Sequence, residues 1–209
     1  MSIENKEIEL KLQVLDAAQW DAIIEYVKAL PNQQHRETIH LAAVYYDTAG
    51  AVLRNHKMAY RVRRENDCWV ATVKGGGSAS NGLHQRMEYN VLVETGQADF
   101  QVFDDLPLDE AIRSSLKGQA FIAVLATDFI RQAVTVLYNQ SKVEIALDQG
   151  VIRAQGKECP ILEIELELMS GQQADIIEFG EVLLHKFALA RENRSKFARG
   201  LALAENVME

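Results

Sequence analysis

The sequence predicts an α+β protein that is mainly antiparallel β. Apolar and charged residues alternate with a period of two in most segments, which is typical of strands that have one face on a core. Short polar turns, such as Asn66-Asp67 and Asn139–Ser141, separate several of these segments and indicate antiparallel neighbours. Helical patterns are few and do not alternate with the strands, which argues against a parallel βαβ sheet.

The first helix is expected over Ala17–Leu30. Asp16 can cap its N-terminus, and Pro31 lies just past its end. Its apolar residues recur at helical spacing. They are Trp20, Ile23, Ile24 and Val27.

Strands are expected along the whole chain. Met58–Glu65 and Cys68–Lys74 form a predicted hairpin, and the segment Gly75–Gly82, rich in Gly and Ser, is expected to be a loop at the end of that hairpin. The other expected strands are Ile3–Val14, His40–Thr48, Arg86–Glu94, Phe121–Leu137, Lys142–Leu147, Val151–Ala154 and Pro160–Met169.

Three further helical segments are expected. A short helix begins near Asp109 in the mixed region Ala98–Gly118, and Gln172–Ala188 has an amphipathic helical pattern. Ser195–Glu205 forms a last helix or turn. No internal repeat and no linker divides the chain, so one domain is expected.

Composition and charge exclude several classes of protein. The 209 residues are 48% hydrophobic and 25% charged, which suits one globular domain. The net charge of −8 argues against non-specific binding of nucleic acid, which needs a broad basic surface, but allows a local basic pocket for a small polyanion. No apolar run is long enough to span a bilayer, and the charged N-terminus predicts no secretory signal.

The two cysteines, Cys68 and Cys159, have no metal-binding spacing and form no disulfide framework. A reducing compartment is the simplest setting for such a chain, so the sequence predicts a cytoplasmic location.

Charged side chains recur at every second position of the expected strands. In the first strand Glu7, Glu9 and Lys11 share one face, while apolar residues take the other. Two carboxylates beside an ammonium are an arrangement that suits a metal ion and a phosphate. The other sets on one face are Arg61 with Arg63, Thr72 with Lys74, Arg86 with Glu88 and Asn90, Lys142 with Glu144, Ala146 and Asp148, and Glu163 with Glu165 and Glu167.

Two structures can account for this pattern. One is an open sheet with its apolar face on a core and its charged face in water. The other is a closed barrel with a charged lumen and an apolar outer face covered by helices. Acids cluster with acids and bases with bases along the strands, and like charges on one face repel unless opposite charges lie between them. This favours a barrel in which both sets meet a ligand.

The order of these motifs resembles the CYTH superfamily, the triphosphate tunnel metalloenzymes named for class IV adenylate cyclase and thiamine triphosphatase. The resemblance covers essentially the whole chain and is strongest to the N-terminal domain of bacterial inorganic triphosphatases. The segments that carry the closer similarity are Gly82–Arg86, Glu144–Gly150 and Glu163–Leu168. The resemblance implies one CYTH-like domain over residues 1–209, without a C-terminal CHAD domain, folded as an eight-stranded closed β-barrel with helices packed outside.

The resemblance also implies roles for individual residues, with Mg²⁺ or Mn²⁺ as cofactor. The residues implied to bind the phosphate chain are Lys11, Arg61, Arg63, Lys74, Arg86, Arg131 and Lys196. Those implied to hold metal are Glu7, Glu9, Glu163, Glu165 and Glu167. Those implied to act in catalysis, through metal, water or base orientation, are Glu7, Glu9, Lys11, Glu88, Glu144 and Asp148.

The activity implied is hydrolysis of inorganic triphosphate to pyrophosphate and phosphate. Three alternatives stay open: a class IV adenylate cyclase, a thiamine or nucleoside triphosphatase, and a polyphosphate-binding module without catalysis. The expected partner is a small polyanionic substrate, with neither nucleic acid nor membrane, and a homodimer is compatible with the sequence.

Overall fold

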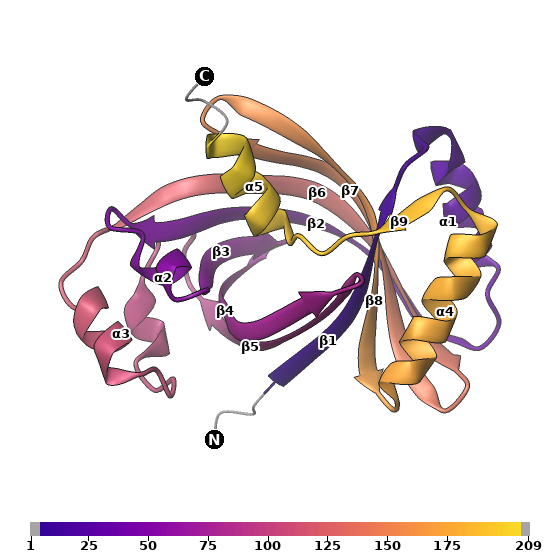
Figure 1. Ribbon diagram of the computed structural model, residues 1–209, viewed down its shortest axis with the longest axis horizontal. Helices are drawn as coiled ribbons and strands as arrows, with labels where there is room; N and C mark the ends of the chain where they lie inside the picture. The colour runs from indigo at the N-terminus through magenta and orange to yellow at the C-terminus, as the bar shows by residue number, and fades with distance from the viewer. Residues whose placement is uncertain (1–4, 206–209) are drawn as a thin grey trace.

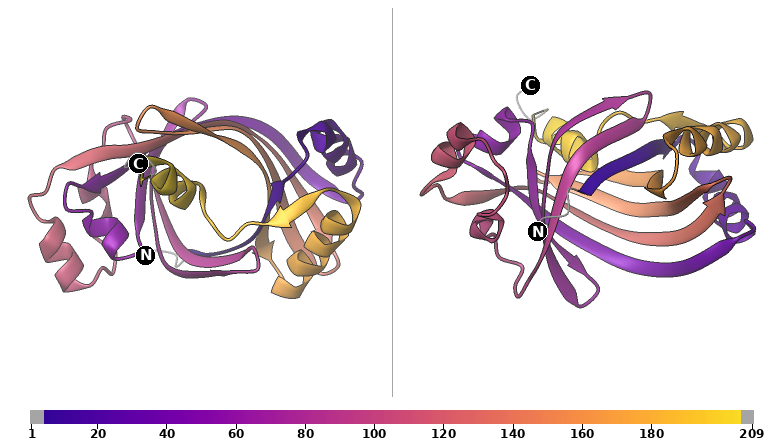
Figure 2. Two further views of the ribbon diagram at one scale, coloured as in Figure 1. Left: turned by 45° about the horizontal axis from the view of Figure 1, so that its top comes forward. Right: turned by 90° about the horizontal axis from the view of Figure 1, so that it is seen from below.

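The computed structural model describes residues 5–205 and shows a closed antiparallel barrel (Figures 1 and 2). Its strands follow the order β5-β4-β3-β2-β6-β7-β8-β1, and β1 pairs with β5 to close the ring of eight. A short β9 continues the pairing along β1 where β5 ends. The strands are β1 (Asn5–Val14), β2 (Gln33–Thr48), β3 (Ala59–Glu65), β4 (Cys68–Ser80), β5 (Leu83–Val93), β6 (Phe121–Tyr138), β7 (Ser141–Ala154), β8 (Lys157–Ser170) and β9 (Leu189–Arg191).

Helices surround this barrel in two groups (Figure 1). One group lies against β1 and β8, and the other lies beside β3 and β4. None of the described helices is long and apolar enough to cross a membrane. The helical elements are η1 (Ala17–Gln19), α1 (Trp20–Lys28), α2 (Val52–Asn55), η2 (Phe100–Phe103), α3 (Glu110–Leu116), α4 (Gln173–Lys186) and α5 (Lys196–Glu205).

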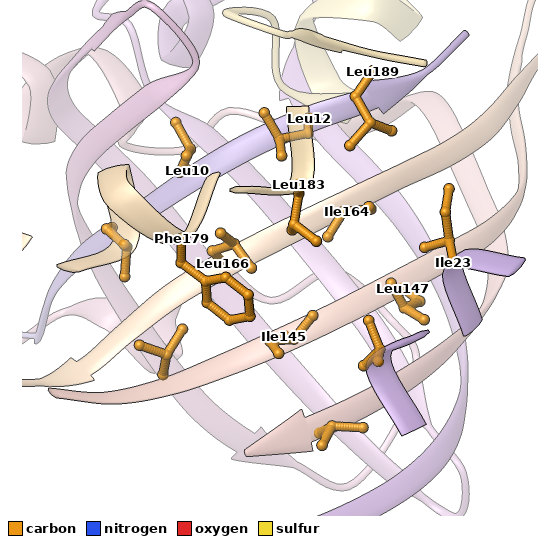
Figure 3. Packing of buried hydrophobic residues seen from close by; sticks show 14 of the residues in the cluster. Leu10, Leu12, Ile23, Ile145, Leu147, Ile164, Leu166, Phe179, Leu183 and Leu189 are labelled. Atoms are coloured by element: carbon orange, nitrogen blue, oxygen red, sulfur yellow. The ribbon is translucent and has the colours of Figure 1, made fainter. Parts of the chain in front are cut away.

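The larger outer core lies between α1, α4 and the barrel (Figure 3). Leu10 and Leu166 point outward from β1 and β8 against Phe179 of α4, and all three are essentially inaccessible to solvent. Each such side chain contributes about 1.5–3 kcal/mol by its burial. Gly180 allows α4 to lie this close, since a Cβ there would stand 2.1 Å from Leu10 Cδ2.

A second outer core covers β3 and β4. Tyr60 and Val73 point outward from these strands and pack with Leu53 of α2 and Phe103 of η2. Helices α1 to α4 therefore pack outside the barrel, which confirms the predicted fold class. The outward apolar face leaves the charged face of the same strands for the lumen, because successive side chains alternate.

Helix α5 differs from the others, because it lies against the inner face at one end of the barrel. Its Phe197 and Leu201 pack with Tyr45, Leu125 and other apolar residues of β2, β6 and β7. Tyr45 and Phe197 stack with ring centroids 5.3 Å apart and both line the lumen. Packing against this apolar inner patch holds α5 in the mouth of the barrel.

The predicted loop over Gly75–Gly82 is wrong, because β4 continues to Ser80. A bulge between Gly75 and Ser78 absorbs the glycines, and the only turn residues are Asn81 and Gly82, both with positive φ. Positive φ at both positions is the backbone of a tight hairpin turn. The backbones are so close here that a Cβ on Gly77 would stand 2.2 Å from the Gln85 carbonyl oxygen.

Most other expected elements are present, with changed ends. Strand β2 begins at Gln33 rather than His40, and the two expected strands Lys142–Leu147 and Val151–Ala154 are one strand, β7. Helix α2 and strand β9 were not predicted, because each spans only a few residues. Ile3 and Glu4 of the first expected strand lie outside the described residues.

Candidate active site

The lumen of the barrel contains a cavity of about 290 Å³ walled by charged side chains. Alternation places Glu7, Glu9 and Lys11 of β1 inward, opposite the leucines of the outer core. All of the site residues predicted from sequence line this cavity except Asp148 and Glu163, which lie fully buried behind it. The predicted site residues that line it are Glu7, Glu9, Lys11, Arg61, Arg63, Lys74, Arg86, Glu88, Arg131, Glu144, Glu165, Glu167 and Lys196.

Three carboxylates form a group that we call the acidic cluster: Asp148 of β7 with Glu163 and Glu165 of β8. One oxygen from each lies within 4.8 Å of the other two. Antiparallel pairing sets this spacing, because Asp148 is directly opposite Glu163 in the register. Oxygens so arranged could hold a divalent cation.

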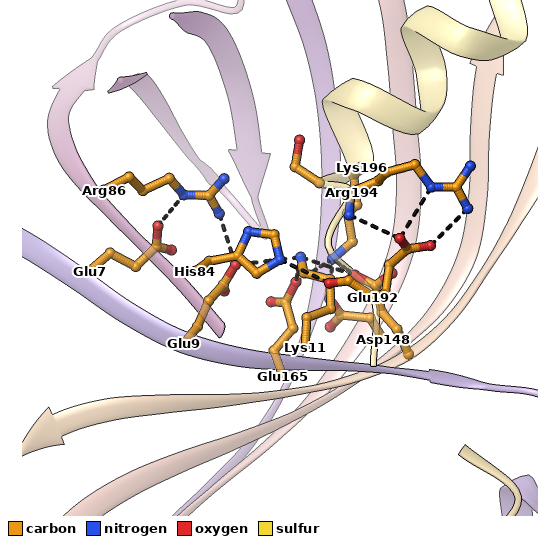
Figure 4. A network of polar contacts seen from close by, with 12 residues as sticks. Glu7, Glu9, Lys11, His84, Arg86, Asp148, Glu165, Glu192, Arg194 and Lys196 are labelled. Carbon is orange, nitrogen blue, oxygen red and sulfur yellow. Dashed lines mark hydrogen bonds and ion pairs between the residues drawn. The ribbon is translucent and has the colours of Figure 1, made fainter. Parts of the chain in front are cut away.

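Cations from three elements neutralise the acidic cluster, and Figure 4 shows two of them, Lys11 and Lys196, beside Asp148 and Glu165. Lys196 Nζ of α5 lies 2.7 Å from Asp148 Oδ2 and 2.9 Å from Glu165 Oε1. Arg131 of β6 donates two hydrogen bonds of 2.7 Å to the Asp148 carboxylate. The cluster therefore holds its charge in ion pairs, and unpaired charge at this depth would be costly.

Two more cations complete this neutralisation. Lys11 Nζ lies 2.5 Å from Glu165 Oε1, and Arg199 of α5 pairs with Glu163. Burial opposes the charge on Lys11, but Glu165 and Glu9 outweigh burial and raise the pKa of its ammonium. These carboxylates therefore favour the charged ammonium of Lys11.

A second ionic network lies on β1, β4 and β5. Arg86 Nε lies 2.5 Å from Glu7 Oε2, and Arg86 Nη2 lies 2.9 Å from Glu9 Oε1. Lys74 Nζ lies 2.8 Å from both Glu7 and Glu88. Burial favours the neutral acid, but Lys74 and Arg86 hold the pKa of Glu7 well below its usual range.

Glu144 and Glu167 differ from these acids, because neither has an ion pair or hydrogen bond within residues 5–205. They are direct neighbours across β7 and β8, and Glu167 also faces Glu9 of β1. Burial together with Glu7 and Glu9 raises the pKa of Glu167 to about 7, and burial raises that of Glu144 as well. Negative charge therefore exceeds positive charge on this wall, which is the electrostatic condition for a cation site.

Positive charge exceeds negative charge on β3. Arg61 lies 3.7 Å from Glu88, and its buried Nε has no hydrogen-bond partner among the described residues. Burial and the neighbouring Arg61 lower the pKa of Arg63 to about 10. Arg63 itself pairs with Glu65, and its Nε lies 2.8 Å from Glu65 Oε1. Arg61 therefore has a free donor next to a second arginine, which suits the oxygens of a polyphosphate.

Two buried residues near the site, Arg199 and His84, were not predicted from the sequence. Arg199 lies one helical turn after Lys196, so helical spacing could have identified it. His84 lies two residues before Arg86 on the same face of β5, and its Nε2 lies 2.9 Å from the Glu192 carbonyl oxygen (Figure 4). Burial lowers the pKa of His84, which favours the neutral ring, and the contact with Glu192 ties the segment before α5 to the barrel wall.

The fold and the site together define a class of protein: an antiparallel barrel whose mixed-charge lumen accommodates a small polyanion. The CYTH domain model matches residues 5–201, and the chain belongs to this family. It is 34% identical over 200 residues to an inorganic triphosphatase of Haemophilus influenzae. That alignment covers 95% of this chain and 55% of the relative, so the chain spans little more than half of that protein's length.

Solved structures share the fold. A Hippeastrum protein named as an adenylyl cyclase, with a dominant triphosphatase activity, matches with a TM-score of 0.66 and 17% identity over 95% of this chain and 96% of its own. A Bacillus halodurans protein named as an adenylate cyclase matches with a TM-score of 0.57 and 19% identity, covering 93% and 97% of the two chains. At these identities the likeness shows the barrel fold.

Proposed function

We propose that the protein is a metal-dependent hydrolase that converts inorganic triphosphate and water to pyrophosphate and phosphate. The observation that carries this proposal is the division of charge in one lumen. Arg61, which has a buried Nε without a partner among the described residues, lies on β3 beside Arg63, and carboxylates without cations lie on β7 and β8. Such a lumen suits a polyphosphate that enters with a divalent cation, and the similarity to an inorganic triphosphatase supports this substrate.

The cations would bind and orient the phosphate chain. Arg61 and Arg63 offer guanidinium donors to its oxygens, and Lys74 and Arg86 can exchange their contacts with Glu7 for contacts with phosphate. Lys11, Arg131 and Lys196 can do the same from the acidic cluster. These donors stabilise the charge that builds on the leaving pyrophosphate.

The carboxylates released by that exchange, together with Glu167, which has no cation partner within residues 5–205, would hold Mg²⁺ or Mn²⁺. We assign Glu7, Glu9, Glu165 and Glu167 to this role because they line the cavity, and Glu163 because it belongs to the acidic cluster. A bound divalent ion supplies charge neutralisation and an acidified water. Glu88, Glu144 and Asp148 would orient that water or the neighbouring bases.

Hydrolysis forms a bond from the water oxygen to the terminal phosphorus and breaks the bond from that phosphorus to the bridging oxygen. The bridging oxygen leaves with pyrophosphate, and the water proton passes to a carboxylate or to solvent. Glu144 is a candidate acceptor, because it faces the lumen without a cation partner among the described residues. No nucleophilic side chain is required, so no covalent intermediate is expected.

The test is release of phosphate from inorganic triphosphate, ATP and thiamine triphosphate, each with Mg²⁺, with Mn²⁺ and with chelator. Metal-dependent release that is fastest from inorganic triphosphate supports the proposal. Cyclic AMP formed from ATP would instead identify an adenylate cyclase. Triphosphate binding by calorimetry without turnover would identify a binding module.

We also propose that the protein acts in the cytoplasm on small anions and not on nucleic acid. Its two cysteines are free thiols, and its net charge is −8. Cell fractionation that recovers it outside the cytoplasm would contradict this location. Light scattering of the purified protein decides between a monomer and a homodimer.

A further inference from the structure

A second cavity of about 290 Å³ adjoins the first. Lys74, Arg86, Ser195 and Phe197 line both cavities, so the two share a wall. The second cavity is lined by the start of β3, the β4–β5 hairpin and α5, the helix that packs inside the barrel mouth. A ligand in the lumen that extends past Lys74 and Arg86 enters this space.

The charged residues that line the second cavity all have the same sign. Its charged lining residues are Arg54, Lys57, Lys74 and Arg86, and no aspartate or glutamate is among the described residues that line it. The first cavity, by contrast, is lined by glutamates as well as by cations. Because all of its charged lining residues are cations, the second cavity attracts anions although the chain as a whole has a net charge of −8.

Arg54 and Lys57 are the unpaired members of this set. Both are exposed, and neither forms an ion pair within residues 5–205, whereas Lys74 and Arg86 are each paired with Glu7. Their charge is therefore available to a ligand without the loss of an existing contact. This distinguishes them from the cations of the lumen, which must first leave a carboxylate.

The backbone that carries these two residues is held in place. Asp47 is 1% exposed, and its carboxylate accepts hydrogen bonds from the backbone N–H of Leu53 at 2.9 Å and of Arg54 at 3.2 Å. Lys57 takes a positive φ of 57° and donates its N–H to the Arg54 carbonyl at 2.9 Å. The turn around α2 therefore holds the backbone of both residues beside the cavity that their side chains line.

We propose that this second cavity is a subsite for phosphate groups beyond the third, so that the substrates include linear polyphosphates such as tetraphosphate. The inference rests on the proposed function and specifies its substrate class. A triphosphate in the lumen would contact Lys74 and Arg86, and a fourth phosphate would continue toward Arg54 and Lys57. The same cations disfavour a positively charged group such as the thiazolium of thiamine triphosphate.

The reaction at the far end of the chain is unchanged. Water adds to the terminal phosphorus in the lumen, and the bridging oxygen leaves with a chain one phosphate shorter. Arg54 and Lys57 would act on binding of the non-reacting end, so they affect KM more than kcat.

The test compares the wild type with the double variant Arg54→Gln/Lys57→Gln. Steady-state kinetics are measured with inorganic triphosphate, tetraphosphate, ATP and thiamine triphosphate, each with Mg²⁺. The matched control is Lys28→Gln/Lys117→Gln, which removes the same charge from exposed positions that line neither cavity. We expect the Arg54/Lys57 variant to lose about tenfold in kcat/KM for tetraphosphate, mainly through KM, and less than twofold for triphosphate.

Each other outcome contradicts the inference in a different way. If the wild type hydrolyses triphosphate and the two double variants lose tetraphosphate activity equally, the subsite is absent and the proposed function stands. If only ATP depends on Arg54 and Lys57, the occupant is a nucleoside. If the wild type hydrolyses nothing, the proposed function fails, and calorimetric binding of tetraphosphate to the same variants then decides on the subsite by itself.

Discussion

Two groups of carboxylates on β7 and β8 are in opposite electrostatic states. The acidic cluster of Asp148, Glu163 and Glu165 is saturated with cations, including Lys196 at 2.7 Å from Asp148. Glu144 and Glu167 lie on the same two strands, yet they have no cation partner within residues 5–205, and the pKa of Glu167 is raised to about 7. Strand register brings the acids together in both groups. Only the acidic cluster is neutralised, because α5 and β6 supply the cations that pair with it.

The comparison shows how the protein can hold buried charge before a ligand arrives. We call the acidic cluster the saturated wall. It stabilises the barrel, because its ion pairs join β1, β6, β7, β8 and α5. We call Glu144 and Glu167 the unsaturated wall. Their buried charge has no cation partner within residues 5–205, so it lowers the stability of the protein without a ligand and favours binding of a cation. The predictions below test this division, in order of decreasing effect.

The largest effect is expected from Lys196→Met. It leaves the three carboxylates of the acidic cluster with one buried cation fewer and removes the tie to α5. Removing one partner of a buried ion pair costs about 3–5 kcal/mol, which urea denaturation with chelator measures as a fall in the free energy of unfolding. Lys28→Met at the surface is the control and should change it by less than about 0.5 kcal/mol. A loss as small as the control's would mean that the cluster is not held by Lys196.

Glu9→Gln should reduce metal-dependent hydrolysis of triphosphate by about 100- to 1,000-fold, or about 2.7–4 kcal/mol. Glu9 faces both Arg86 and Glu167, so its charge is proposed to hold the metal ion on the unsaturated wall. The measurement is phosphate release by folded protein over a range of Mg²⁺ concentrations. Full activity at ordinary Mg²⁺ would remove Glu9 from the metal site. Glu158→Gln, on an exposed side chain, is the matched control.

Added Mg²⁺ should stabilise the chelated wild type against heat. A free concentration 100 times the dissociation constant adds about 2.7 kcal/mol to the free energy of unfolding. The shift should shrink in Glu167→Gln and persist in the exposed variant Glu158→Gln. An equal shift in both variants would place the cation away from the unsaturated wall.

Glu167→Gln should stabilise the metal-free protein at high pH. The pKa of Glu167 is raised from 4.5 to about 7 in the folded state, so the folded protein binds more protons than the unfolded chain between these values. The wild type therefore loses stability as pH rises from about 4.5 to 7, by about 1–3 kcal/mol, and the variant does not. The two should be equally stable below pH 4.5 and differ most above pH 7. The measurement is the urea denaturation midpoint of the wild type and of Glu167→Gln, with chelator, at a series of pH values. A difference between the two proteins that is the same at every pH would contradict the raised pKa of Glu167.

Much of the site could be predicted from local pattern. A period of two places Glu7, Glu9 and Lys11 on one face of the strand, whether the sheet is open or closed. The same holds for the glutamates of β8. The order of such motifs along the chain indicated the family. The prediction of a loop at Gly75–Gly82 was wrong, because glycines also occur in β-bulges and where two backbones approach closely.

The sequence by itself determined which side chains share a face, because alternation is a property of the strand. Only the tertiary structure decided that this face is the inside, because the closing pair β1–β5 joins residues about eighty positions apart and leaves no local trace. It also decided which acids are neutralised. Lys196 reaches Asp148 because α5 packs inside the barrel mouth, and the turn that presents Arg54 and Lys57 depends on a buried Asp47. Such contacts follow from packing between distant segments, which the spacing of residues along the chain does not encode.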